Sequence, residues 1–257
     1  MRTYTVFIST TLLLLGCSGG LHSPNELASL QEITLKGHML YEYDVASWIA
    51  SDAVIAQHPD PNNLQYFLAK KDQGQWTVVF GKQHESDKAF LISYEVAIAK
   101  DFTSHSMKEY SPPMKDTGWY ANAAIALQHS LRDFGASEIK YNYYVLADTS
   151  GIFSVYLVPA QTSSDIIPLG GDVCYSVDAQ GTGIITKTKL HNSIIAMPKA
   201  SENTTAGMHT HVLIPTPVET DILYVLRQKP RVQHYVVSSK HIFVIGADGR
   251  IRISTER

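Results

Sequence analysis

Two histidines and an aspartate are spaced in a way that suits metal binding. His209 and His211 are two residues apart in a segment that we expect to be extended. Side chains two positions apart on a strand point to the same face. Asp221 follows shortly afterwards, beyond a loop that contains Pro215 and Pro217. Two imidazoles and a carboxylate form the ligand set of a catalytic zinc site, which keeps one further position open for water.

The elements around these residues are predicted to be a strand followed by a helix. Thr220 is a candidate N-cap, which would place Asp221 in the first helical turn. The helix dipole favours a carboxylate at this position. The apolar run that predicts the helix consists of Ile222, Leu223, Val225 and Leu226.

The segment His209-Thr210-His211, the Pro-Thr-Pro turn at 215–217 and the helix-opening Asp221 resemble the motif of the JAMM/MPN metalloproteases. Residues 234–239 and 241–247 are similar to the closing strands of that family, and Asp248-Gly249 would form the turn to a last strand at 250–253. The resemblance covers residues 117–257. It implies that His209, His211 and Asp221 hold Zn²⁺ for hydrolysis of a peptide or isopeptide bond.

Two positions depart from the family pattern, and both concern catalysis. The loop before Asp221 is one residue short, and Val218 stands where the family has a serine that helps to stabilise the tetrahedral intermediate. The family's general base is a glutamate on an early strand. Glu138 is the candidate here, at the start of a strand predicted at 138–146. Lys140 or Asn142 is an alternative occupant of that position, and neither would act as a base; Glu219 is a second candidate base.

His191, His234 and His241 also lie in this half of the chain. His234 and His241 begin predicted strands, where a histidine is usually a structural residue. The alternative is that one of the three contacts a metal ligand, because a ligating imidazole usually donates its other N–H to a neighbour.

The N-terminus has the features of an export signal. Met1-Arg2 precedes an apolar run that ends at Gly16-Cys17, too short for a mature membrane span. The segment Leu14-Leu15-Gly16-Cys17 resembles the bacterial lipobox, which implies cleavage before Cys17 and a lipid on its thiol. Ser18 after the cysteine would favour the periplasmic face of the outer membrane. The alternative is a chance cysteine after a generic signal.

Composition narrows the range of functions. The hydrophobic content of 44% is enough for a full core, and a net charge of −3 without a basic cluster argues against nucleic acid as a partner. If Cys17 carries lipid, Cys174 has no cysteine with which to form an internal disulfide. We interpret Cys174 as a residue of a strand core. The expected partners are a membrane, reached through the lipid, and a protein or peptide.

The expected fold class is α+β, with two units after the signal (1–17). Residues 18–37 would be a tether that ends in a short helix around 26–32. Residues 38–100 would be a small α+β domain, in which Asp44 caps a helix at 45–57 before a three-stranded meander. Residues 101–116, which contain Pro112-Pro113, would be a linker. Residues 117–257 would form a JAMM/MPN-like (cytidine-deaminase-like) mixed sheet with flanking helices, which begins with a helix at 117–134. Strands would follow at 140–147, 152–160, 172–178 and 183–198, with a loop at 161–171.

The sequence thus predicts a lipoprotein of the bacterial cell envelope with a zinc-dependent peptidase or isopeptidase domain, acting on peptides or cell-wall crosslinks. The alternative is a catalytically inactive binding or scaffold lipoprotein, with or without the metal. The position of Glu138 discriminates between them, because a general base must lie within hydrogen-bond reach of the open metal position.

Overall fold

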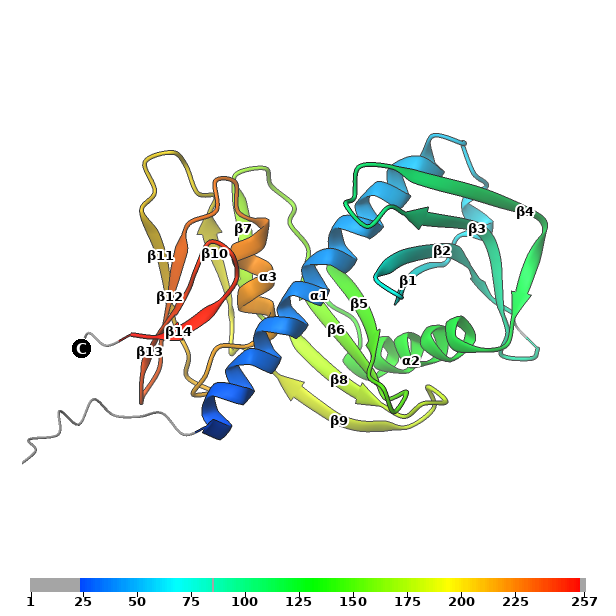
Figure 1. The fold of residues 1–257 in the computed structure, drawn as a ribbon. Coiled ribbons are helices and arrows are strands. Elements are labelled where there is room, and N and C mark those ends of the chain that lie inside the picture. Colours follow the sequence, from blue (N-terminus) through cyan, green and yellow to red (C-terminus); the bar gives the residue numbers. More distant parts are fainter. Residues whose placement is uncertain (1–23, 85, 255–257) are drawn as a thin grey trace, which may run out of the picture.

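A long helix, α1 (Pro24–Ile55), runs between two groups of strands in the computed structural model, which describes residues 24–84 and 86–254. Cys17 and the predicted signal lie outside these residues. Figure 1 shows the sheet of residues 66–116 (β1–β4) on one side of α1 and the sheet of residues 206–253 (β11–β14) on the other. The sheet of β5, β6, β8 and β9, which falls within residues 141–189, lies beneath. The predicted α+β class is confirmed. Within the described residues, no helix combines the length and the apolarity that a membrane crossing requires.

The first sheet is an antiparallel meander, in the order β1-β2-β3-β4. Its strands are β1 (Tyr66–Asp72), β2 (Gln75–Gln83), β3 (Phe90–Ile98) and β4 (His105–Asp116), and a short 3-10 helix (Pro61–Asn63) precedes them. Helix α2 (Trp119–Phe134) then leads to an antiparallel sheet in the order β5-β6-β8-β9. These strands are β5 (Tyr141–Ala147), β6 (Phe153–Pro159), β8 (Val173–Val177) and β9 (Ile184–Lys189).

The C-terminal part contains the only parallel strand pair among the described sheets. Strand β11 (Ala206–Thr210) pairs in parallel with β12 (Gln233–Val237), and α3 (Glu219–Arg227) is the crossover between them. The remaining elements are β13 (Ile242–Ile245), β14 (Ile251–Ile253), and the two-stranded sheet of β7 (Ile166–Gly170) and β10 (Ile194–Pro198). Two parallel strands need a crossover connection, and here that connection is α3. The helix therefore starts near the carboxyl end of β11.

Helix α1 differs from the prediction. Residues 24–37, expected to be a tether with a short helix only around 26–32, are helical throughout, and Asp44 lies in the middle of the helix rather than at its start. The boundary expected at residue 38 therefore falls inside one helix. The buried stripe that explains the longer helix recurs at helical spacing from well before Asp44: Leu30, Leu40, Tyr43, Ala46, Ala50 and Val54.

The expected linker at 101–116 is also wrong, because residues 105–116 form β4. This strand lies at the edge of its sheet. Its pairing with β3 is irregular: Tyr94 faces Glu109, whereas Ile92 faces Met114. Pro112-Pro113 falls in this irregularity, and an edge strand with a bulge is where a sheet accommodates proline.

The segment 161–198 differs too. Part of the expected 161–171 loop is β7, and the expected strand at 183–198 is two strands, β9 and β10, with a break at 190–193. Strand β10 pairs with β7 and not with the sheet that contains β9. The break allows the chain to pass from one sheet to the other, and it places His191 between them.

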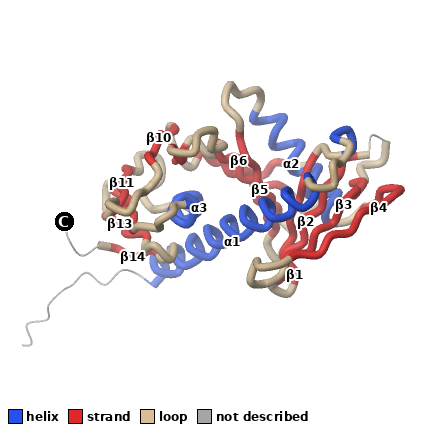
Figure 2. The backbone as a smooth tube through the Cα atoms, turned by 90° about the horizontal axis from the view of Figure 1, so that it is seen from above, coloured by secondary structure: helices blue, strands red, loops and turns tan. Residues whose placement is uncertain are grey.

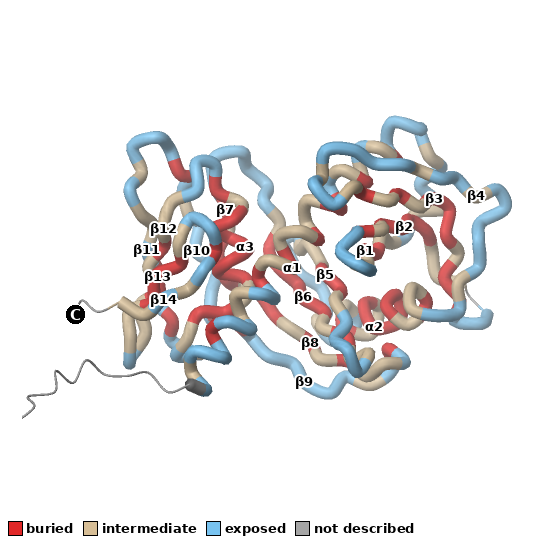
Figure 3. The backbone as a smooth tube through the Cα atoms, in the orientation of Figure 1, coloured by how far each residue is buried: buried red, intermediate tan, exposed pale blue. Residues whose placement is uncertain are grey.

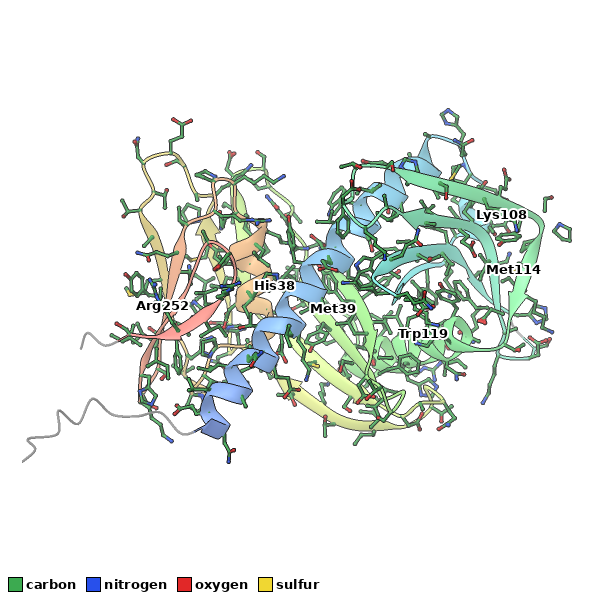
Figure 4. The ribbon with its side chains drawn as sticks, in the orientation of Figure 1. His38, Met39, Lys108, Met114, Trp119 and Arg252 are labelled. Atoms are coloured by element: carbon green, nitrogen blue, oxygen red, sulfur yellow. The ribbon has the colours of Figure 1, made fainter. Side chains whose placement is uncertain are left out.

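Close packing of α1 fixes the position of α3. A Cβ built on Gly37 would lie 2.5 Å from the Ile222 Cβ, so the two helices approach in a way that only glycine permits at this position. Further along the contact, His38 (labelled in Figure 4) faces the β13–β14 turn at Gly249. Figure 2 shows α3 enclosed by strands with α1 beside it, and Figure 3 shows that α3 is buried while β9 is exposed.

Candidate metal centre

Four buried side chains meet at the edge of the C-terminal sheet: His191, His209, His211 and Asp221. Their candidate ligand atoms all lie within 4.8 Å of one another. The three residues predicted from the sequence are thus brought together, and His191 is an unpredicted fourth member.

Local structure explains the position of each predicted residue. His209 lies on β11, and the His211 N–H donates to the Val237 carbonyl (2.8 Å), which continues the parallel ladder by one residue. The two histidines therefore face the same side, as the alternation of a strand requires. Asp221 lies in the first turn of α3, as expected.

The helix cap differs from the prediction, because Val218 and not Thr220 is the N-cap residue of α3. Valine has no side-chain acceptor, so only one half of a capping box forms. The Val218 N–H donates to Asp221 Oδ2 (2.8 Å). This bond holds the carboxylate in one orientation, with Oδ1 toward the histidines.

Several inward-facing atoms of the cluster lie within 3.2 Å of one another. His191 Nε2 lies 3.0 Å from both His211 Nε2 and Asp221 Oδ1. Asp221 Oδ1 is 3.2 Å from His209 Nε2, and Asp221 Oδ2 is 3.2 Å from His211 Nε2. Nitrogen and oxygen ligands about 2.0–2.1 Å from zinc would lie roughly 3.3 Å apart in a tetrahedron. The four distances above are within a few tenths of an ångström of that value, and the ligand atoms of the whole cluster spread over up to 4.8 Å, so the four side chains are close enough to converge on one ion.

The outer nitrogen of every ring has its own partner. His191 Nδ1 lies 2.6 Å from Asp172 Oδ1, and His209 Nδ1 lies 2.7 Å from His234 Nε2. His211 Nδ1 lies 3.2 Å from the Ile214 carbonyl oxygen. His234 thus contacts a candidate metal ligand, which was the alternative considered for it, whereas His241 lies 3.5 Å from Glu26 of α1.

These outer partners determine the state of the inner nitrogens. The Ile214 carbonyl can only accept, so His211 Nδ1 donates and a neutral ring presents its lone pair at Nε2. Neutral His191 likewise donates from Nδ1, to the Asp172 carboxylate, and presents its lone pair at Nε2. Burial, followed by the charge of His209, lowers the pKa of His234 to about 4, so His234 is neutral and can accept from His209. Three lone pairs and a carboxylate thus converge on one point, which is the arrangement that a cation requires.

One inner atom has no hydrogen-bond partner. His209 Nε2 is buried and unsatisfied among the described residues. A buried polar atom without a hydrogen bond lowers the stability of the folded state by about 1–3 kcal/mol. The folded protein bears this cost when no ligand interacts with His209 Nε2. A metal ion at the centre of the cluster would supply that interaction.

Without a metal ion, the charge balance of the cluster depends on which of its side chains are protonated. Burial alone would raise the pKa of Asp221, but the hydrogen bond with His191 and the close imidazoles of His209 and His211 hold it well below its usual range. Burial alone would lower the pKa of His191, but its bonds to Asp172 and Asp221 raise it to about 10. A proton on His191 therefore substitutes in part for a metal ion.

The candidate bases are not members of the cluster. Glu138 is exposed and precedes β5, which belongs to a different sheet. Glu219 is half-buried. Its pKa is raised, first by burial, and it interacts with Lys36 of α1. Burial also raises the pKa of Cys174 to about 12, which suits the predicted structural role and not that of a nucleophile.

A small cavity gives access to one side of the cluster. Its volume is about 260 Å³, and His191 and His211 contribute to its lining. Ile195, Val212 and Leu213 form an apolar rim, and each of these side chains is exposed. His191 has the largest exposed side-chain fraction of the four cluster residues, 7%, which makes it the one closest to solvent.

Asp172→Asn should weaken zinc binding by about 10–100-fold, because an amide cannot fix the His191 ring as a carboxylate does. Competition with a chromophoric chelator would measure this change. Asp165→Asn is the matched control, since Asp165 is an exposed aspartate on a neighbouring loop. Equal affinities for the two variants would show that Asp172 does not position the ligand.

The metal-free and metal-loaded forms should respond to pH in opposite directions. The folded pKa of His191 lies above its ordinary value, so its stabilising contribution is complete below pH 6.5 and is lost as the pH rises toward 10. Zinc binding requires deprotonated ligands and should strengthen over the same range.

Urea unfolding of the chelated protein at pH 6.5 and 9, with zinc titrations at both values, would test this. The lower pH is chosen because His234, with its pKa lowered to about 4, adds a loss of stability below pH 6.5. Greater stability of the chelated protein at pH 9 would contradict the assignment.

Comparisons of the chain with protein-family models, with curated proteins and with solved structures found no match.

Proposed function

We propose that this chain is a zinc-binding protein whose metal is held by His191, His209, His211 and Asp221. The observation that carries the proposal is the orientation of the rings: every Nδ1 has an outer partner, and every Nε2 faces the same point. Imidazole ligands suit zinc, copper, iron and nickel. Zinc is favoured because histidine nitrogen and carboxylate oxygen are among its usual ligands, and four protein ligands are its usual number in structural sites.

The donor set favours a structural role for the metal. Four protein ligands complete a tetrahedron, whereas catalytic zinc sites keep a position open. The ligands come from three separate segments: the β9–β10 connection, the end of β11 and the start of α3. A metal that links them would contribute its binding free energy to folding. This is the metal-retaining, non-catalytic alternative considered from the sequence.

Metal analysis by mass spectrometry tests the proposal. The full chain should retain about one zinc per molecule, and His209→Ala/His211→Ala should retain none. His105→Ala is the control, because His105 is exposed on β4. Zinc retained by His209→Ala/His211→Ala as well as by His105→Ala would overturn the assignment. Absence of zinc from the unaltered chain would overturn it too.

A second candidate is the zinc-dependent peptidase or isopeptidase that the sequence resemblance implied, with a peptide or cell-wall crosslink as substrate. It is favoured by the position of His191, which borders the access cavity and is paired with Asp172. Bound zinc would supply Lewis-acid chemistry. If His209, His211 and Asp221 sufficed to hold it, His191 Nε2 could accept a proton while Asp172 fixed the ring.

His191→Ala separates the two candidates. If the centre is structural, His191→Ala should weaken zinc binding strongly, and neither the unaltered chain nor the variant should hydrolyse amide substrates. In a hydrolase it should leave zinc in place and abolish an activity that the unaltered chain possesses. Glu138→Gln serves as the control, and its loss of activity would restore Glu138 as the base.

We also infer that the protein is exported and anchored in the bacterial cell envelope through a lipid on Cys17, with the periplasmic face of the outer membrane favoured. The support is the apolar run that ends in Leu-Leu-Gly-Cys. Cys17→Ser should abolish incorporation of radiolabelled palmitate and release the chain from the membrane fraction. Unchanged labelling would contradict the lipid at this residue.

A further inference from the structure

Two segments beside the metal cluster expose aliphatic side chains and carry no charge. Residues 190–198 and 210–218 contain no Asp, Glu, Lys or Arg. Four of their large aliphatic side chains are exposed, and Val212 is the most exposed, at 73%. Three of the four line the cavity at the metal cluster. Adjoining exposed apolar side chains mark a site where a protein or a membrane is bound. The apolar surface, as we call it, consists of Ile194, Ile195, Val212 and Leu213.

A series of contacts connects the apolar surface to the start of α1. The His211 N–H donates to the Val237 carbonyl (2.8 Å) at the end of β12. In the turn that follows, the Ser238 N–H donates to the His241 carbonyl (2.9 Å). His241 Nε2 lies 3.5 Å from Oε1 of Glu26, which belongs to the first turn of α1. The apolar surface and the start of α1 therefore lie at the same end of the molecule (Figure 1).

The lipid proposed on Cys17 would keep this end close to a membrane. Helix α1 begins at Pro24, only seven residues after Cys17. An extended chain spans at most about 3.3–3.6 Å per residue, so the start of α1 lies within about 25 Å of the lipid attachment. The other end of α1 is about 48 Å further along the helix axis. The bilayer is thus always near the end of the molecule that carries the apolar surface.

The charges at this end suit a membrane surface. Lys240 is exposed in the turn between β12 and β13, where it would attract anionic headgroups. The acidic side chains of the first turns of α1 have basic neighbours: Glu26 contacts His241, and Glu32 contacts Lys36. Buried apolar area and attraction to anionic lipids together determine how strongly a surface binds at the membrane interface. The apolar surface supplies the first of these contributions and Lys240 the second.

We propose that this end of the protein docks on a lipid bilayer, with Val212, Leu213 and Leu27 among the headgroups. Leu27 lies beside Glu26 on α1 and is 51% exposed. The proposal rests on the lipid anchor proposed at Cys17: the lipid holds the chain at the membrane, and the apolar surface sets its orientation. The cavity at the metal cluster would then open toward the bilayer, so a molecule that approaches His191 would pass along the membrane surface.

Fluorescence quenching on the full, lipidated and zinc-loaded chain tests the proposal. The vesicles consist of phosphatidylethanolamine and phosphatidylglycerol, with or without a phospholipid that carries a doxyl quencher near its headgroup. An NBD fluorophore at Val212→Cys, in a Cys174→Ser background, should lose most of its emission when the quencher lipid is present. The same label at Ile55→Cys is the matched control, because Ile55 is 66% exposed at the opposite end of α1. Its emission should persist.

Flotation of the vesicles distinguishes a failure of this proposal from a failure of the lipid anchor. If the chain floats with the vesicles but the label at Val212→Cys is not quenched, or both labels are quenched equally, the docking surface is refuted and the anchor stands. If the chain does not float, the anchor and the docking surface are both refuted. A label at Val212→Cys that is shielded from aqueous iodide, yet insensitive to the quencher lipid, would show that a protein such as a second copy covers the surface instead.

Discussion

Removal of zinc with a chelator is expected to lower the melting temperature by about 8–16 °C. A ligand present at a thousand times its Kd stabilises the folded state by about 4 kcal/mol, and each kcal/mol shifts the melting temperature of a chain of this size by roughly 2–4 °C. The chelated protein would keep a buried carboxylate and three imidazoles that have lost their shared partner. Differential scanning calorimetry with and without the chelator measures the shift, and added zinc should reverse it.

His209→Ala/His211→Ala provides the internal control for this result. Without the two imidazoles the melting temperature should be low and insensitive to chelator. A chelator effect of the same size in the variant would mean that the stabilising metal lies elsewhere. An unchanged melting temperature in the unaltered chain would mean that the cluster holds no stabilising metal.

Asp44→Ala should lower the free energy of unfolding by about 3–5 kcal/mol. Arg227 donates to Asp44 Oδ2 through Nε (2.9 Å) and to Oδ1 through an Nη (2.5 Å). Tyr144 adds a bond of 2.9 Å to Oδ1. The side chains of Asp44 and Arg227 are only 13% and 15% exposed, so the variant would leave a largely buried guanidinium without its counter-ion.

Two comparisons make this prediction specific. Glu32→Ala removes one partner of an exposed ion pair with Lys36 on the same helix and should cost no more than about 1 kcal/mol. Asp44→Ala/Arg227→Met should recover part of the loss, because it removes the unpaired charge. Urea unfolding measures all three variants. A loss below 1 kcal/mol for Asp44→Ala would show that the network does not connect α1, α3 and β5 energetically.

The part of the site that depends on local geometry could be predicted from the sequence. The spacing of His209 and His211 defines one face of a strand, and Asp221 precedes the apolar run of a helix. Both expectations hold because neither depends on the rest of the fold. The meander of β1–β3 and the C-terminal hairpin were predicted for the same reason, since their turns and alternation are visible in short windows.

The remaining ligand and the outer partners could not be predicted, because long-range packing brings them to the site. His191 lies in a break that exists only because β10 pairs with β7. Asp172, its partner, follows the end of β7. No periodicity relates these positions to His209. The one available signal was the presence of His191, His234 and His241 in the same half, and His234 proved to be a partner of a candidate ligand.

The helix assignment failed for a different physical reason. The helix predicted at 45–57 contains Trp48, whose large apolar side chain suggests burial but is exposed, whereas Tyr43, Ala46 and Ala50 form the buried face. Asp44 resembles an N-cap only when the sequence is considered locally. Its actual role is set by Arg227, a residue on a distant helix that no local pattern identifies.

X-ray absorption spectroscopy at the zinc edge tests the central claim most directly. The claim predicts four nitrogen or oxygen ligands at about 2.0–2.1 Å, with the multiple-scattering signature of three imidazoles. His191→Ala should reduce that signature to two imidazoles. A spectrum with fewer than three imidazoles in the unaltered chain, or with sulfur in the coordination shell, would contradict the assignment of His191, His209, His211 and Asp221 as the metal centre.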